Sequence, residues 1–208
     1  MYEQFEMLPG EKKQRILNAA LREFSAQAFK NASTARIAEE AGISKGALFL
    51  YFSTKRQLYQ YLYEYAYNVV RNEFTGKLDF ESRDPIYVLT AVTRVKMDIM
   101  RVHPELFDFF VKIYLGETDE ELRGMIHRDS ESERGRFIGE LLSDLDYSGF
   151  RGDFPPEIVM DIIRWVIDGY TNRLTASLKA ENASFAEAAV LTDEYYRYLD
   201  VIRKAFYQ

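Results

Sequence analysis

The segment from Ser33 to Lys55 has the residue types and spacing of two short helices that could present a helix end to a DNA groove. Ser33 and Ser44 are good N-cap residues, because a serine hydroxyl accepts a hydrogen bond from an amide of the first helical turn. Gly42 lies between them and can take the positive φ that ends a helix. Two helices joined by a short glycine-containing turn form a helix-turn-helix, whose second helix docks in the major groove.

Apolar residues in this segment repeat at helical spacing. Ile37, Ala38 and Ala41 form a stripe along the first short helix, and Leu48 and Phe52 lie four residues apart on one face of the second. The pattern therefore predicts helices at about 34–41 and 45–52.

The charge of the chain is unevenly distributed. The 208 residues carry a net charge of −6, but residues 11–57 hold nine Lys or Arg and four Glu, or +5, which leaves −11 on the remainder. A basic head on an acidic body suits contact with phosphates at one end of the molecule. On charge alone, a merely solvated basic surface remains an equal alternative.

Composition excludes several classes of protein and site. With 47% hydrophobic and 15% aromatic residues, the chain is not of a disordered type. It has no Cys and two His, which excludes disulfides and thiolate metal sites and argues against a transition-metal sensor, so we expect no metal and no cofactor. The start lacks a signal peptide pattern, and no segment reaches the roughly 18 apolar residues of a membrane span. We expect a cytoplasmic protein without membrane contact.

Nearly every segment of the chain has a helical pattern, and none alternates like a strand. The predicted fold is all-α, with about nine helices and breaks at polar, Gly-rich or Pro-containing stretches. The expected helices span about 11–28, 34–41, 45–52, 53–74, 85–102, 105–115, 119–145, 157–180 and 184–206.

The last two helices have apolar surface that predicts a partner. The final helix has two apolar stripes, and the preceding one has a stripe with Gly169, which permits close approach. Paired helices from two subunits would form a four-helix interface with two-fold symmetry, although a large domain could also bury both stripes internally. The predicted interface comprises Ile158, Ile162, Trp165, Gly169, Leu191, Tyr195, Tyr198, Leu199 and Ile202.

The N-terminal stretch resembles the TetR family of one-component transcriptional regulators. The resemblance rests on Ile16-Leu-x-Ala-Ala-x-x-x-Phe24, on the stretch from Ser33 to Phe52, and on Lys55-x-x-Leu58, in this order and spacing. It implies a three-helix DNA-binding head over residues 1–53 and a larger helical ligand-binding and dimerisation domain over 54–208. Beyond about residue 60 the resemblance is one of architecture only.

The resemblance also implies which residues meet DNA. It makes 45–52 the recognition helix, with Ala47 and Leu50 toward bases and Phe49 and Tyr51 toward the backbone, and it makes Lys55 a phosphate clamp. The implied DNA-binding residues are Ser33, Thr34, Arg36, Ser44, Lys45, Gly46, Ala47, Phe49, Leu50, Tyr51 and Lys55. The implied core of the head is Ile16, Phe24, Ile37, Ala38, Leu48 and Phe52.

Three of these positions depart from the family pattern. Phe49 lacks the hydroxyl of the usual Tyr, and Leu50 can contact only a thymine methyl among base edges. Arg36 stands where an acid is usual, so it either opposes the helix dipole or reaches a base or phosphate. We therefore expect shape readout and backbone contacts to matter more than a rich base code.

Aromatic and Met side chains predict an apolar pocket in the C-terminal domain. The candidates are Tyr63, Tyr67, Met97, Met100, Phe107, Phe110, Tyr114, Met125, Phe137, Trp165 and Tyr170, with Asp98, Arg101, Asp168 and Arg173 as possible polar anchors. Plain core packing and solvated faces are the alternatives for each of them.

The combined prediction is a sequence-specific repressor. A homodimer would bind a near-palindromic operator in double-stranded DNA and be released by an apolar or aromatic small molecule, through a population shift between two spacings of its heads. An enzyme is the main rival, but no nucleophile-base pair, phosphate loop or metal spacing is present. A structural helical module would not explain the capped, basic helix-turn-helix.

Overall fold

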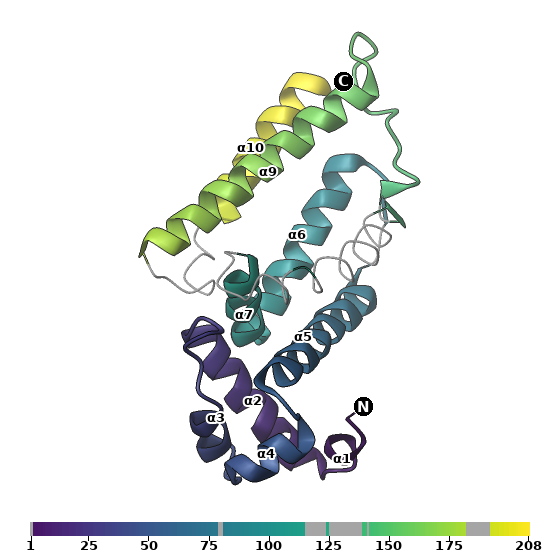
Figure 1. The fold of residues 1–208 in the computed structure, drawn as a ribbon. Coiled ribbons are helices and arrows are strands. Elements are labelled where there is room, and N and C mark those ends of the chain that lie inside the picture. The colour runs from purple at the N-terminus through teal and green to yellow at the C-terminus, as the bar shows by residue number, and fades with distance from the viewer. Residues whose placement is uncertain (1, 79–80, 115–123, 125–138, 141, 182–191) are drawn as a thin grey trace. The chain divides into compact units, whose positions relative to one another are not determined.

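The computed structural model describes residues 2–78, 81–114, 124, 139–140, 142–181 and 192–208, and in these residues the protein is all-α (Figure 1). Its helices in chain order are α1 (Glu3–Glu6), α2 (Gly10–Ala26), α3 (Thr34–Glu40), α4 (Lys45–Tyr51), α5 (Lys55–Lys77), α6 (Pro85–Val102), α7 (Pro104–Tyr114), α9 (Pro156–Glu181) and α10 (Thr192–Phe206). The predicted fold class is confirmed. Most of the helix expected over 119–145, and residues 184–191 of the final helix, lie outside the described residues.

The first compact unit contains α1 to α4, the part of α5 up to Asn72, and the chain from Glu105 along α7. All six predicted core residues of the head are at most 2% exposed. The same hydrophobic cluster continues into α5 through Leu58 and Leu62 and into α7 through Phe109. The domain boundary expected after residue 53 stays a prediction. The two compact units divide the chain differently, since the start of α5 shares its core with the head.

The short helix α1 was not predicted from the sequence. It buries Phe5 completely, with its ring centroid 4.7 Å from that of Phe52 and 5.1 Å from that of Tyr61. A four-residue helix is too short to produce a periodic pattern, so only tertiary contacts reveal it.

The second compact unit contains Glu73–Pro104, α9 and α10. Its core joins Ile86 of α6 with Val159 and Ile163 of α9 and with Tyr195 and Leu199 of α10. Asp84 caps α6 by accepting a hydrogen bond from the Tyr87 amide at 2.8 Å, and Pro85 occupies the first turn as predicted. No helix in the described parts of the chain is long and apolar enough to span a membrane.

Candidate nucleic-acid interface

Both helices of the helix-turn-helix begin at capped N-termini, as predicted. The Ser33 hydroxyl accepts a hydrogen bond from the Arg36 amide at 3.3 Å, and the Ser44 hydroxyl accepts one from the Ala47 amide at 3.1 Å. Between them Gly42 has a φ of +68°, and the Ile43 amide donates to the Ala38 carbonyl at 2.9 Å. The left-handed residue turns the chain sharply, so α3 and α4 are joined by a tight, hydrogen-bonded turn.

One face of α4 is open to solvent, and the other is buried. Leu48 is 1% exposed and anchors the helix in the core of the head, whereas Leu50 is 64% exposed. Lys45 and Gly46 are also exposed, and Ala47, Phe49 and Tyr51 are half-buried. An isolated apolar side chain as exposed as Leu50 contributes nothing to the core, so its position suits contact with a partner that covers α4.

Gly46 is not required by the packing of the chain itself. A Cβ added there would meet only the Ser44 Oγ, at 3.8 Å, which is ordinary van der Waals contact. Gly46 is the second residue of α4, where glycine is less favourable than alanine by at most about 1 kcal/mol, so packing gives no reason for its presence. Close approach of an external backbone to the N-terminus of α4 supplies one, since the first amides of a helix attract phosphate.

Two lysines flank the aromatic residues of α4. The Lys12 Nζ donates a hydrogen bond to the Tyr51 hydroxyl oxygen at 3.4 Å, and the Lys45 Nζ lies 5.9 Å from the centroid of the Phe49 ring. Neither lysine has a carboxylate partner among the described residues. Lys12 was missed as a candidate because it precedes Tyr51 by 39 residues, and only the tertiary fold brings the start of α2 to the end of α4.

Arg36 is occupied within the head. Its guanidinium binds the carboxylate of Glu23 through Nε at 3.0 Å and Nη2 at 2.6 Å, and the Ser33 amide donates to the same carboxylate at 2.6 Å. Glu23 is 9% exposed. In the structure Arg36 therefore neutralises a buried acid of α2, and this ion pair competes with its predicted contact with DNA.

Glu23 was detectable in the sequence. It lies on the apolar face of α2, three residues after Ala20 and seven after Ile16, where a charged side chain must find a partner. Burial alone would raise the pKa of Glu23, but the hydrogen bonds from Arg36 and the Ser33 amide, with the charges of Arg36 and Lys55, hold that pKa below its ordinary value. The carboxylate is thus kept charged at the N-terminus of α3.

Lys55 also binds inside the chain. Its ammonium donates to the carbonyl oxygens of Phe29 at 2.6 Å, Ala32 at 3.1 Å and Lys30 at 3.2 Å, and lies 4.7 Å from the centroid of the Phe29 ring. Burial lowers the pKa of Lys55, partly offset by the nearby charge of Glu23. Since an ammonium has three donors, the structure shows Lys55 holding the loop between α2 and α3, not extended as the expected phosphate clamp.

The assignment of the predicted ligand-binding residues stays a prediction, and those that the structure describes are divided between the two compact units. Met100 and Phe107 are 4% and 7% exposed, and Tyr63 and Phe110 pack against the core of the first unit. Tyr63 and Tyr67 stack with ring centroids 6.3 Å apart, Met97 is half-buried, and Tyr170 packs against the core of the second unit. Met125, Phe137 and the side chain of Tyr114 lie outside the described residues.

The predicted dimer residues separate into two groups. Tyr195, Leu199 and Ile202 are 6%, 2% and 6% exposed, so they belong to the core of the second unit and cannot form its outer surface. Exposed apolar residues lie on α9 and on the other stripe of α10, namely Ile158 at 51%, Trp165 at 71%, Tyr198 at 38% and Val201 at 64%. Ile162 is half-buried, Gly169 is exposed, and Leu191 lies outside the described residues.

Residues 16–62 match the model of the family described as bacterial regulatory proteins, tetR family. The chain is 28% identical to the HTH-type transcriptional regulator SrpR of Pseudomonas putida, over 70% of this chain and 64% of SrpR. It is 26% identical to the HTH-type transcriptional repressor AcnR of Corynebacterium glutamicum, over 85% of this chain and 88% of AcnR. The chain thus spans just under two thirds of the length of SrpR.

A solved structure has a similar fold along nearly the whole chain. A TetR family transcriptional regulator from Chloroflexus aurantiacus J-10-FL superposes with a TM-score of 0.65 at 20% identity, covering 99% of this chain and 98% of the other. At this identity the likeness establishes the fold. The matched segment 16–62 contains α3, α4 and the Glu23 network described above.

Proposed function

We propose that this helix-turn-helix transcriptional regulator of the TetR family is a repressor that binds a near-palindromic operator as a homodimer and is released by a small molecule. Its relatives are regulators and not enzymes, and one of them, AcnR, is named a transcriptional repressor. We also propose that it acts in the cytoplasm, where its DNA would be.

The observation that carries the proposal is the exposed face of α4. A capped helix presents Lys45 and Gly46 at its positive end and the 64% exposed Leu50 on its open side, next to the Lys12–Tyr51 pair. The helix N-terminus and the lysines suit phosphate, and Leu50 suits the methyl group of thymine. Ser33, Ser44 and Thr34 lie at the N-termini of the two helices, where the phosphate backbone would pass.

The exposed apolar residues of α9 and α10 support the homodimer. Trp165 and Val201 are 71% and 64% exposed, and large apolar side chains gathered on one helix pair indicate an interaction surface. A second copy would cover them through a two-fold axis and present two α4 helices to successive major grooves, about 34–36 Å apart. The operator is then expected to be near-palindromic.

Release by an effector would follow from a change of that spacing. A ligand that binds a conformer with a different separation of the heads would shift the population away from the DNA-bound one. The apolar side chains predicted to line a pocket support an apolar or aromatic effector for this step.

The test is fluorescence anisotropy of the purified full chain with DNA from around its own gene, against scrambled DNA, over a salt series. We expect saturable binding with a preference for a near-palindromic fragment. Lys45→Gln should weaken binding to all sequences and reduce the slope of log affinity against log salt by about one. Lys204→Gln removes the same charge from an exposed side chain of α10 and serves as the matched control.

Two results would contradict the proposal. Equal binding to specific and scrambled DNA, or no binding to genomic fragments at low salt, would show that α4 does not read an operator. A small molecule that tightens operator binding would show that the ligand acts as a co-repressor and does not release the protein from DNA.

A further inference from the structure

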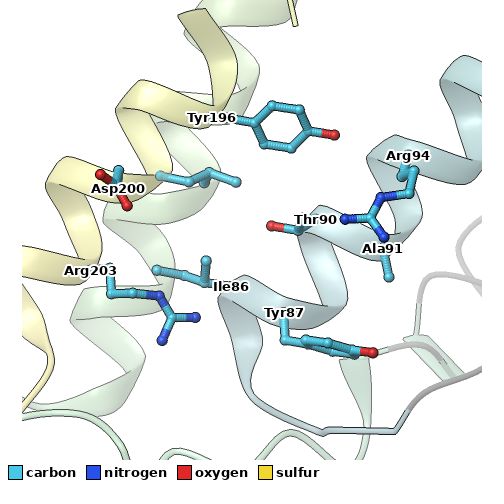
Figure 2. A pocket seen from close by; sticks show the side chains of 9 residues that line it. Ile86, Tyr87, Thr90, Ala91, Arg94, Tyr196, Asp200 and Arg203 are labelled. Carbon is cyan, nitrogen blue, oxygen red and sulfur yellow. The ribbon is translucent and has the colours of Figure 1, made fainter. Parts of the chain in front are cut away.

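A cavity of about 300 Å³ lies in the second unit between α6 and α10 (Figure 2). None of its lining residues was predicted to bind an effector, and one of them, Leu199, was predicted to lie in the dimer interface. Its floor is formed by Ile86 and Leu199, which are 5% and 2% exposed and belong to the core of this unit. This volume is at the lower end of the range for small-molecule sites, so it suits a compact ligand.

The helices that form the cavity are held together on several sides. The Arg203 Nη2 lies 2.8 Å from the Oδ1 of Asp84, the residue that caps α6. The Ile86 amide donates to the Tyr207 hydroxyl at 3.4 Å, and the Thr93 and Tyr195 hydroxyl oxygens lie 3.0 Å apart. These links fix the spacing of α6 and α10, so a ligand would enter a site that is already formed.

The lining of the cavity has a net positive charge, because Arg94 is its one charged side chain without an ion pair among the described residues. Arg203 is balanced by Asp84, and Asp200 pairs with Lys204 at 3.2 Å. Arg94 has no ion pair or hydrogen bond with any described residue. A planar guanidinium binds a carboxylate through two parallel hydrogen bonds, so Arg94 is the lining residue best suited to an anionic ligand.

Hydroxyl groups and apolar surface complete the lining. Figure 2 shows the side chains of Thr90 and Tyr196 directed from α6 and α10 into the space between the helices, with Arg94 one turn beyond Thr90. Ile86, Ala91 and Leu199 add apolar surface. The cavity therefore combines a cation with hydroxyls and an apolar floor.

We propose that the cavity between α6 and α10 binds a small molecule that joins a carboxylate to a compact, ring-sized apolar body. Arg94 holds the carboxylate, Thr90 and Tyr196 donate further hydrogen bonds, and Ile86 and Leu199 contact the ring. The exposed Tyr198 and Val201 lie on the opposite flank of α10 from Tyr196, so the cavity stays open when that flank is covered by a second copy. Only the regulatory consequence, control of operator binding, rests on the proposed function.

The test is isothermal titration of the full chain, without DNA, with 2-naphthoate. Its neutral analogue naphthalene-2-carboxamide and its cationic analogue 2-naphthylmethylamine are titrated in parallel. We expect saturable binding of one naphthoate per chain and binding of the carboxamide weaker by about tenfold or more, because a hydrogen-bonded charge is lost. Arg94→Gln should weaken naphthoate binding by a similar factor and leave carboxamide binding unchanged.

Matched variants separate this site from general effects of charge and folding. Arg101→Gln removes the same charge from α6 at a residue that pairs with Asp98 at 3.1 Å outside the cavity, and it should bind naphthoate like the unaltered chain. Ala91→Phe fills the cavity and should abolish binding of both naphthyl compounds. Helicity and the urea midpoint of each variant verify that it is folded.

Several outcomes would overturn the proposal. These are no naphthoate binding, equal binding of naphthoate and carboxamide, or equal loss in Arg94→Gln and Arg101→Gln. Tighter binding of the amine than of naphthoate would indicate a cation-binding site instead, formed by Asp193 and Asp200, which line a shallower hollow beside Tyr196. A chain that binds naphthoate through Arg94 but reads no operator would contradict the proposed function and leave this site in place.

Discussion

Replacing Glu23 by Gln tests whether a buried carboxylate organises the start of α3. Glu23 is 9% exposed and accepts three hydrogen bonds, one from the Ser33 amide and two from Arg36. A hydrogen bond to a charged group contributes about 1.5–3 kcal/mol, but the Arg36 side chain is 58% exposed, so its share is screened. Since Gln keeps one carbonyl acceptor, we expect the variant to lower the free energy of unfolding by about 2 kcal/mol.

The matched control is Glu40→Gln. Glu40 also pairs with an arginine, Arg22, but both side chains are about half exposed, at 43% and 52%. Exposed pairs contribute between zero and about 1 kcal/mol, so this variant should be nearly neutral. Both variants remove one negative charge from the head. A difference between their free energies of unfolding therefore reports the effect of burying the Glu23 carboxylate.

The measurement is urea unfolding followed by circular dichroism at 222 nm, between pH 3 and 7. The pKa of Glu23 is lowered in the folded protein, so the stabilisation by its charge is complete above the unfolded pKa of about 4.3 and is lost as pH falls through the folded pKa. The stability difference between the unaltered protein and Glu23→Gln should therefore be full at pH 7 and shrink below about pH 4. Equal effects of the two variants at pH 7, or a stability difference that does not decrease at all between pH 7 and pH 3, would refute the reasoning.

Three further substitutions probe the interface, the turn and the exposed apolar surface. Gly46→Ala should leave stability unchanged or raise it by up to about 1 kcal/mol, and it should weaken operator binding about tenfold. Calorimetry measures the stability and anisotropy the operator binding, with Gly76→Ala as the control. Operator binding as tight as that of the control would contradict this prediction. Gly42→Ala should lower stability by about 1–2 kcal/mol because φ is +68°, and an unchanged melting temperature would contradict this. Trp165→Glu should convert the dimer to monomer in analytical ultracentrifugation. Val102→Glu, which also alters an exposed apolar residue, should leave the dimer intact. Equal behaviour of the two variants would exclude α9 from the dimer surface.

Local patterns predicted the helix-turn-helix because each of its signals acts over a few residues. The capping serines, the positive φ of Gly42 and the burial of Ile37, Leu48 and Phe52 all appear as expected. Caps, turns and i to i+4 stripes depend on neighbours in sequence, so one sequence contains the information they require.

Which stripe faces inward required the tertiary structure. The two stripes of the last helix are both apolar in sequence, and the prediction drew interface residues from each. In the structure Tyr195, Leu199 and Ile202 are buried by α6 and α9, whereas Tyr198 and Val201 are exposed. Periodicity measures the spacing of apolar residues and contains no information about which neighbouring helix covers them.

The sequence by itself determined that this protein is all-α, where its helix-turn-helix lies and which residues cap the two helices, since these depend on local backbone chemistry. Only the tertiary structure decided the partners of its charged groups. Arg36 binds Glu23, Lys55 binds the carbonyls of the loop after α2, and Arg94 lines a cavity without forming an ion pair with any described residue. A charge acts on whatever lies within a few ångströms, and those neighbours come from segments far apart in the chain.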